Sequence, residues 1–531
     1  MMKKTMKQYS FASQLKSLAV VFGIALTFAS CAKEDVAQNP TNTEGDNDKN
    51  LTTFVAGDEA KTRTSLDYNS SDFSWEAGDY IYVKDDDGVL RKSTNAPTSK
   101  VAAFKYKVPG KFTASSSYKV YYFGKNSSNN QVVIPVAQSQ STPNNTAHFG
   151  VSGDYGTATA TGTLGGGSFS FQLEHQAAYL VFHPYVSNTL LQSCYLTKIE
   201  VSSDNDIAST YTLNASTGTL QSGSTGATTD KEIILSTKGS GDYANGFPLT
   251  TASDNVAVNG AYMVIKPGTH TLKVRYWLKD VSTGTEGTVT KAFKAFNYDV
   301  NNYYDIDGNL NIRNYDGDHY YMWDAQEQYW KGHEWNLGGS QPTLSYGLTG
   351  ATTSNDYAKS NADSRWYNES YPGFGVSNPA THTSCKDLPN VNEMTWYAAK
   401  GEPRWDADEL WTTMGHLYKG GMWFKKKANI SGYNPNTAVD GSDWRTNGNG
   451  NIWSVSQTLP DAADANNYFY LPALGYYYSD QLDDVGSIGD YWSSSALPRS
   501  NGSAYYLNFS SSYIIVNNGS RGYGFRSEAF Q

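Results

Sequence analysis

Cysteine, charge and long apolar runs are all scarce in this chain of 531 residues. Its three cysteines are too few for a disulfide framework. Charged residues make up only 17% of the chain, and 41 basic against 51 acidic side chains leave a net charge of −10. That balance argues against nucleic acid or an anionic membrane surface as the main partner. No run after residue 31 approaches eighteen apolar residues, so the body of the chain is expected to be soluble.

Residue patterns that carry enzyme chemistry are also missing. The eight histidines include no His-x-x-x-His or His-Glu-x-x-His spacing, and no phosphate-binding glycine loop occurs. Cys194 and Cys385 lack an identifiable base and are expected to be buried thiols. Asp406, Asp408 and Glu409 form a carboxylate cluster of the kind a secreted hydrolase would need, but their pattern is typical of a helix start. We therefore expect no enzyme and no metal or other cofactor.

What the chain has in quantity is aromatic side chains, 14% of all residues, and 48 glycines. This mixture favours many short strands joined by turns. The stretch 169–173 alternates apolar and polar residues, and 178–182 is nearly continuous in apolar residues, as in a strand buried on both faces. A glycine-rich break at 165–167 precedes them. The pattern predicts two tandem β-sandwich domains, 51–168 and 169–312.

The composition of the sequence changes from Tyr320 onward, because eleven of the thirteen tryptophans lie beyond this point. Asn390-Val391-Asn392-Glu393 predicts a capped helix, and a second helix is expected over 406–417. Tyr505–Phe509 and Tyr513–Val516 predict a pair of strands near the end. The sequence therefore predicts a distinct α+β domain over 313–531, in a chain that is mainly β.

The N-terminus has the pattern of an export signal. Four lysines precede an apolar run from Leu18 to Phe28, and Ala29-Ser30-Cys31 follows. This end resembles the lipobox of bacterial lipoproteins, which implies a signal peptide over 1–30 and a lipid on Cys31. Residues 36–50 are almost free of apolar side chains, so a flexible tether is expected over 31–50. Lys33-Glu34-Asp35 resembles a signal that sends lipoproteins to the cell surface. We expect an outer-membrane lipoprotein at the cell surface.

Three motifs follow one another in this part of the chain: Thr62-Arg63-Thr64-Ser65, Trp75-Glu76-Ala77-Gly78-Asp79, and Phe171-Gln172-Leu173-Glu174-His175 leading into Ala178–Phe182. Through these motifs, residues 51–312 resemble the fimbrillin family, lipoprotein pilus subunits of Gram-negative gut and oral bacteria with two β-sandwich domains. The resemblance implies that a trypsin-like protease cuts after Arg63, with Lys61 as the competing position. The strand containing Leu51–Val55 would then leave, and a strand of a neighbouring pilin would take its place.

Five segments of the last part of the chain carry a second resemblance: Ser384–Asn390, Gly420–Trp423, Tyr470–Ala473, Tyr491–Ser494 and Gly522–Arg526. Through them, the chain after residue 320 is similar to C-type-lectin-like domains found at the C-terminus of pilus-tip and cell-surface proteins. The sequence lacks the Glu-Pro-Asn, Gln-Pro-Asp and Trp-Asn-Asp signatures of calcium-dependent sugar binding, so that mechanism is not implied. Tyr476, Tyr477 and Tyr478 are candidate ligand-binding residues, because tyrosine offers a large contact area at low entropic cost.

These patterns together predict a fimbrial subunit at the cell surface. The expected role is a tip adhesin whose last domain binds an unidentified host or bacterial surface ligand, with a glycan as one candidate. Two alternatives stay open at this point. A surface glycan-binding lipoprotein of a polysaccharide-uptake system predicts stable monomers without proteolytic maturation, and a secreted hydrolase predicts convergent carboxylates.

Overall fold

The computed structural model describes residues 7–10, 50–57, 65–68, 72–125, 130–214, 217–227, 229–343, 353–370 and 379–531. The chain is mainly β and divides into two compact units. The first unit comprises Met1–Ser187, Tyr195–Val274 and Phe293–Leu310, and the second comprises Asn188–Cys194, Arg275–Ala292 and Asn311–Gln531. The predicted division of the earlier part into domains at residue 168 stays a prediction.

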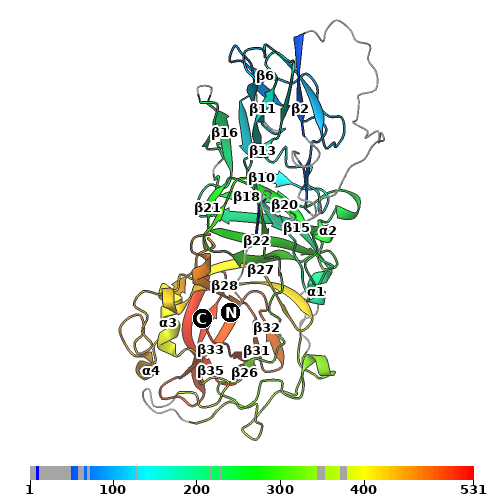
Figure 1. Ribbon diagram of the computed structural model, residues 1–531. Coiled ribbons are helices and arrows are strands. Elements are labelled where there is room, and N and C mark those ends of the chain that lie inside the picture. Colours follow the sequence, from blue (N-terminus) through cyan, green and yellow to red (C-terminus); the bar gives the residue numbers. More distant parts are fainter. Residues whose placement is uncertain are drawn as a thin grey trace, which may run out of the picture. The chain divides into compact units, whose positions relative to one another are not determined.

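One sheet of the first unit runs in the order β6-β5-β8-β11-β12-β2-β7, and β13 also pairs with β11 (Figure 1, blue to cyan). Its strands are β2 (Leu51–Ala56), β5 (Tyr82–Lys84), β6 (Leu90–Lys92), β7 (Phe104–Pro109), β8 (Ser117–Tyr122), β11 (Gly156–Gly162), β12 (Ser168–Phe171) and β13 (Glu174–His175). Buried and more exposed residues alternate in β12 and at the end of β2, as a sheet with one inward face requires. Trp75 lies at the centre of their core, edge-on to Tyr106 and Tyr122.

A second sheet of this unit includes three strands that are buried at every position. These are β14 (Ala178–Phe182), β20 (Ala261–Ile265) and β25 (Asn302–Ile306), and β1 (Lys7–Ser10) pairs with β25. The continuous apolar run at 178–182 was predicted to be a strand buried on both faces, and the structure confirms it.

Further strands and short helical segments complete the first unit. They are β3 (Ser65–Asp67), β4 (Asp72–Ser74), β9 (Gln131–Ile134), β10 (Ala137–Ser139), β15 (Cys194–Ser203), β16 (Ser209–Leu213), β17 (Leu220–Gly223), β18 (Glu232–Ser236), β19 (Phe247–Pro248), β21 (Gly268–His270), β24 (Phe296–Tyr298), α2 (Val256–Asn259) and the 3₁₀ turn η3 (Gly241–Tyr243). β22 (Leu272–Asp280), and β15 through Cys194, supply residues to both units.

The second unit contains a sheet ordered β26-β36-β33-β34-β35-β29 and the strands β23, β27, β28 and β30, paired in that order (Figure 1, mostly yellow to red). Their bounds are β23 (Glu286–Ala292), β26 (Tyr320–Tyr321), β27 (Arg404–Thr413), β28 (His416–Lys425), β29 (Asn451–Ser454), β30 (Tyr468–Pro472), β33 (Gly489–Ala496), β34 (Ser503–Phe509), β35 (Tyr513–Ser520) and β36 (Phe525–Arg526). The remaining elements are β31 (Tyr476–Tyr478), β32 (Gln481–Asp483), α1 (Thr189–Gln192), α3 (Val391–Lys400), α4 (Trp444–Asn447), η4 (Trp335–Leu337), η5 (Lys427–Asn429) and η6 (Ala465–Asn467).

Helix α3 confirms the predicted capping box. The Asn390 side chain accepts from the backbone N–H of Glu393, and the Glu393 carboxylate accepts from the backbone N–H of Asn390. These bonds satisfy donors that a helix start otherwise leaves unpaired. Val391, Met394 and other residues on one face of the helix are buried in the core that also contains Trp405.

The predicted helix over 406–417 is wrong, because these residues form the antiparallel hairpin β27–β28. Met414 and Gly415 both have positive φ, 47° and 75°, which is the geometry of the tight two-residue turn that suits the twist of a hairpin. The threonine-rich and aromatic stretch before the turn favours a strand over a helix. The predicted pairing of strands near the end is confirmed by β34 and β35, with Phe509 opposite Ile514.

Candidate functional site

Two of the predicted site residues, Cys31 and Arg63, lie outside the described residues, as does Lys61. Lipidation and cleavage at these positions therefore stay predictions. The segment expected to be removed, Leu51–Val55, is described, and it forms strand β2 (Leu51–Ala56).

Strand β2 lies inside its sheet, between two neighbours. It runs parallel to β12, with Phe54 opposite Phe169, and antiparallel to β7, with Phe54 opposite Tyr106. Removing β2 would leave two unpaired strand edges facing each other across a slot one strand wide. Unpaired edges of this kind recruit another strand, because their N–H and C=O groups have lost their partners.

The slot is also apolar. The Phe54 and Ala56 side chains are fully buried, whereas Leu51, Thr53 and Val55 are only partly so. The Phe54 ring stacks on Phe169 at 5.3 Å between ring centroids and meets Phe112 edge-on at 5.2 Å. Removing β2 would therefore uncover a hydrophobic trough as well as backbone bonds.

The three candidate tyrosines of β31 lie in different environments. Tyr477 is fully buried, where its hydroxyl donates to the Pro342 carbonyl at 3.0 Å and accepts from the Gln341 amide at 2.8 Å. Tyr476 is partly buried, and Tyr478 is 53% exposed beside Tyr523. Only Tyr476 and Tyr478 can therefore reach a ligand without unfolding the strand, and ligand binding there stays a prediction.

The carboxylates that a hydrolase would need lie inside a hydrogen-bonded network of the second unit. Arg275 donates through Nη2 to Asp406 at 3.0 Å and to the Thr288 hydroxyl at 3.0 Å. Thr288 and Thr290 donate through their hydroxyls to Glu409 at 3.0 and 2.6 Å. Arg275, Asp406 and Glu409 are all buried, so this network joins strands rather than facing a substrate.

Burial and the nearby charge of Asp406 raise the pKa of Glu409 to about 7. The pKa of Asp490 is also raised to about 7, mainly because this carboxyl is buried, where it accepts a hydrogen bond from the Asn508 amide at 2.9 Å. A carboxyl whose pKa rises on folding stabilises the folded state at low pH. That stabilisation is lost as the pH rises toward the folded-state pKa.

Replacing Asp490 with asparagine is expected to stabilise the second unit by about 1–3 kcal/mol at pH 8 and by almost nothing at pH 4. The pKa of Asp490 lies about three pH units above its usual value, which limits the gain in unfolding free energy to about 4 kcal/mol. The cost of burying the new amide reduces that gain. The urea unfolding free energies of the two proteins at both pH values check this. The exposed Asp387, replaced in the same way, should show no such difference, and an Asp490→Asn effect equal at both pH values would contradict the assignment.

Both described cysteines are buried free thiols, as expected. Burial raises the pKa of Cys194 and that of Cys385 to about 12, so each thiol is protonated at neutral pH and is a poor nucleophile. Within the described residues, no group of His, Cys, Asp and Glu could hold a metal ion. No helix in that same part of the chain is long and apolar enough to cross a membrane.

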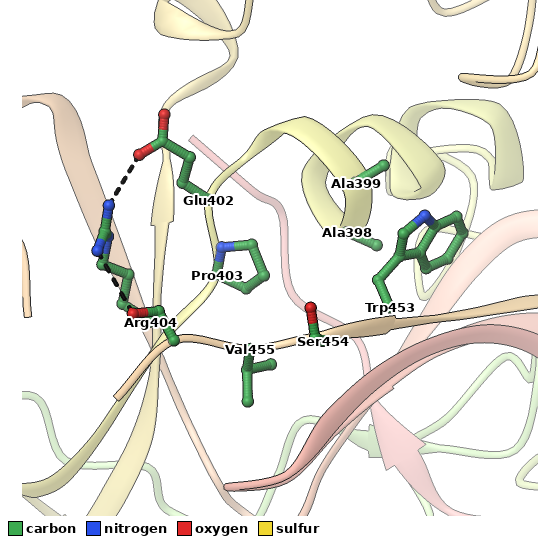
Figure 2. A pocket seen from close by; sticks show the side chains of 9 residues that line it. Ala398, Ala399, Glu402, Pro403, Arg404, Trp453, Ser454 and Val455 are labelled. Carbon is green, nitrogen blue, oxygen red and sulfur yellow. Dashed lines mark hydrogen bonds and ion pairs between the residues drawn. The ribbon is translucent and has the colours of Figure 1, made fainter. Parts of the chain in front are cut away.

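A hollow of about 340 Å³ opens in the second unit where α3 ends, β27 begins and β29 forms the edge of its sheet (Figure 2). Its lining residues are Ala398, Ala399, Glu402, Pro403, Arg404, Trp453, Ser454, Val455 and Ser456. Figure 2 shows Trp453 beside the two alanines, and the Glu402–Arg404 ion pair on the other side of Pro403. The backbone N–H of Trp405 donates to the Ser456 carbonyl at 2.9 Å, which fixes the two walls together.

Sequence reasoning missed this hollow. Among the other tryptophans of this unit, Trp411 and Trp492 are buried, whereas Trp396 and Trp423 are partly exposed. Trp453 received no separate role. The available signal was its place in a polar, asparagine-rich segment, where a core tryptophan has few apolar neighbours.

A second hollow of about 490 Å³ lies beside η4 in the same unit. Its lining includes Asp316, Asp318, Glu327 and Glu334, against the single lysine Lys331. The Trp335 indole N–H already donates to the Asp316 carbonyl at 2.9 Å. This hollow is therefore acidic, and the indole N–H of Trp335 already has a hydrogen-bond partner in the protein.

No protein-family model matches the chain, and no curated protein matches it in sequence. Among solved structures it is similar to a candidate cell adhesion protein of Bacteroides ovatus, at 13% identity over 47% of this chain and 87% of that one, with a TM-score of 0.31. The fimbrial anchor protein Mfa2 of Porphyromonas gingivalis matches at 13% identity over 44% of this chain and 80% of its own, with a TM-score of 0.21. A fimbrial protein of Bacteroides ovatus matches at 11% identity over 90% and 98% of the two chains, with a TM-score of 0.24.

Proposed function

We propose that this chain is a fimbrial subunit of the bacterial cell surface that accepts a strand from another subunit in place of β2. The observation that carries the proposal is the position of β2 between β12 and β7 with Phe54 inserted among aromatic rings. A strand in that position contributes two ladders of backbone bonds and a buried side chain. Another strand in the same position would therefore restore the backbone hydrogen bonds and the apolar burial that are lost when β2 leaves.

The predicted maturation steps suit this exchange. Arg63 and Lys61 both follow β2 in the chain, so a cut at either leaves β2 attached to the body only by hydrogen bonds and packing. A lipid on Cys31 would hold the precursor at the outer membrane until the cut is made. In this scheme the subunit is attached first to the outer membrane through its lipid and later to a neighbouring subunit through the exchanged strand.

The second unit supports a position at the tip of the fimbria. Strand β36 lies in its own sheet between β26 and β33, and the Phe525 and Arg526 side chains are buried. This strand is held by its own unit and is not free to enter a neighbour. A subunit that accepts a strand without giving one would end the fimbria and present its second unit, as a lectin-like domain, to a surface ligand.

Strand exchange is tested with a peptide of the chain's own β2. The protein from residue 32 onward is digested with trypsin, the new N-terminus is sequenced, and a peptide of residues 50–57 is added to the cut protein after β2 has been separated. We expect a cut after Arg63 or Lys61, followed by stoichiometric binding of the peptide and recovery of thermal stability. A peptide carrying Phe54→Asp should not bind, because its charge would be buried without a partner.

Two results would oppose the proposal. A chain that resists trypsin before β3 keeps β2 in place and behaves as the stable monomer of a glycan-uptake protein. A cut protein that neither loses β2 nor takes up the peptide has no exchangeable strand.

A further inference from the structure

We infer that the hollow of about 340 Å³ between the end of α3, the start of β27 and the edge strand β29 binds one uncharged sugar ring, with Trp453 as its stacking surface. The inference rests on the proposed adhesive role of the second unit and gives it a ligand class and a place. The volume is near the lower end of the range for small-molecule sites, about 300–1,000 Å³, which suits a single ring rather than a long chain.

The aromatic surface is held rigidly before any ligand arrives. Trp453 is partly buried and stacks on Trp444, with 6.4 Å between centroids and 22° between planes. Trp444 is itself buried, and its indole N–H donates to Asp440 at 2.9 Å. A fixed ring offers contact area without a further entropic cost, and the C–H face of a pyranose is the complement of such a surface.

Polar groups of the hollow remain available for hydroxyls. Within the described part of the chain, neither the Trp453 indole N–H nor the Ser454 hydroxyl has a hydrogen-bond partner in the protein. Figure 2 shows the Ser454 hydroxyl between Pro403 and Trp453. An apolar ligand would leave these groups unpaired, whereas a ring with several hydroxyls can bond to both.

The charges of the hollow are already paired with one another. The Glu402 carboxylate accepts from Lys425, from Arg404 at 2.9 Å and from the Tyr468 hydroxyl at 3.0 Å. The Lys425 bond above all, with those of Arg404 and Tyr468, lowers the pKa of Glu402 to about 2, so the carboxylate is ionised at neutral pH.

Arg404 also has its own protein partners. Its guanidinium donates further to the Thr458 carbonyl at 3.1 Å. A charged ligand would therefore find no free counter-ion, while the carboxylate keeps about one of its four acceptor positions for a hydroxyl. The pairing favours an uncharged, hydroxyl-rich ligand.

The backbone at Glu402 is consistent with a site. Its φ of 45° lies in the left-handed region, directly after Gly401 caps helix α3. Glycine would adopt this conformation with less strain, so the position keeps a side chain at an energetic cost. The carboxylate that results orders Arg404 and Lys425 along the rim.

The inference is tested by fluorine NMR of the protein from residue 32 onward, labelled with 5-fluorotryptophan and titrated with the methyl glycosides of glucose, galactose, mannose and N-acetylglucosamine. Trp453→Phe assigns the resonance. We expect at least one glycoside to shift the Trp453 signal with a Kd in the millimolar range. Trp453→Ala should weaken that binding by about tenfold or more, as measured by saturation-transfer NMR. Ser454→Ala, at an exposed position where folding is not at risk, should weaken it by about threefold.

Trp396→Ala is the matched control, because Trp396 packs on the same core but does not line the hollow, and its indole N–H is bonded to the Thr437 carbonyl at 2.8 Å. Its binding should equal that of the unaltered protein. The inference is overturned if no glycoside shifts Trp453 at about 50 mM, if binding survives both Trp453→Ala and Ser454→Ala, or if only the charged N-acetylneuraminic acid binds. The β2 peptide assay on the same variants reports strand exchange separately, so loss of sugar binding and loss of fimbrial assembly are distinguished.

Discussion

Replacing Arg275 with methionine is expected to destabilise the second unit by about 3–5 kcal/mol at pH 8. The guanidinium lies 3.0 Å from Asp406 and shares Thr288 with Glu409, and all three charged groups are buried. Methionine fills a similar volume, so the loss is one of charge rather than of packing. It leaves two buried carboxylates without their cation, which costs more than the pair itself contributes.

The loss should shrink as the pH falls. Glu409 has a pKa near 7, so it takes up a proton in mildly acidic solution and no longer needs a counter-ion. Chemical denaturation at pH 8 and pH 5 measures both values. Arg313→Met is the control, because that side chain is half exposed and its pair with Glu528 should contribute less than about 1 kcal/mol. A small and pH-independent loss for Arg275→Met would contradict the network, and Arg275→Met combined with Asp406→Asn and Glu409→Gln should recover much of the stability.

Replacing Phe54 with alanine is expected to cost the first unit about 3–5 kcal/mol, the usual range for a buried phenylalanine. The ring fills the space between Phe112 and Phe169, and alanine would leave a cavity there. Because β2 is held in its slot partly by this ring, the cut protein should also release β2 faster. The unfolding free energy before trypsin treatment and the release rate after it are the two measurements.

Thr53→Ala is the matched control on the same strand, since Thr53 is only partly buried and alternates with Phe54. It should change the unfolding free energy by less than about 0.5 kcal/mol. If Phe54→Ala and Thr53→Ala have equal effects on release, backbone bonds alone hold β2. The aromatic trough would then have no part in strand exchange.

Local sequence patterns predicted some elements of the fold correctly and others wrongly. The apolar run at 178–182 and the capping box at Asn390 each depend on neighbours in sequence, and the structure has both. The residues 406–417 satisfied a helical spacing by coincidence. Their conformation is decided by the pairing of β27 with β28 across the turn at Met414 and Gly415, and with β23, where Thr288 lies opposite Glu409 from far earlier in the chain. A helical spacing contains neither pairing.

The candidate sites also differ in how much of each could be predicted from the sequence. The segment of β2 was expected from the resemblance to the fimbrillin family, whereas its place between β12 and β7 could not be predicted from the sequence. The hollow at Trp453 brings together residues near 400 and near 455. The backbone of Glu402, whose carboxylate lies at the rim, has a positive φ that is usually expected of glycine. No spacing rule joins these residues, so only the folded chain shows them together.

The mixed pairing of β2 bears on the direction in which a strand can enter. One neighbour of the slot is parallel to β2 and the other is antiparallel, so a strand of the opposite polarity would also meet one parallel and one antiparallel edge. The backbone alone therefore does not distinguish head-first from tail-first insertion. The distinction falls to the side chains, because the slot takes a large ring at Phe54 and only a methyl group two residues later at Ala56. The direction in which a strand enters would then depend on the order of its side chains, with a large one followed two residues later by a small one.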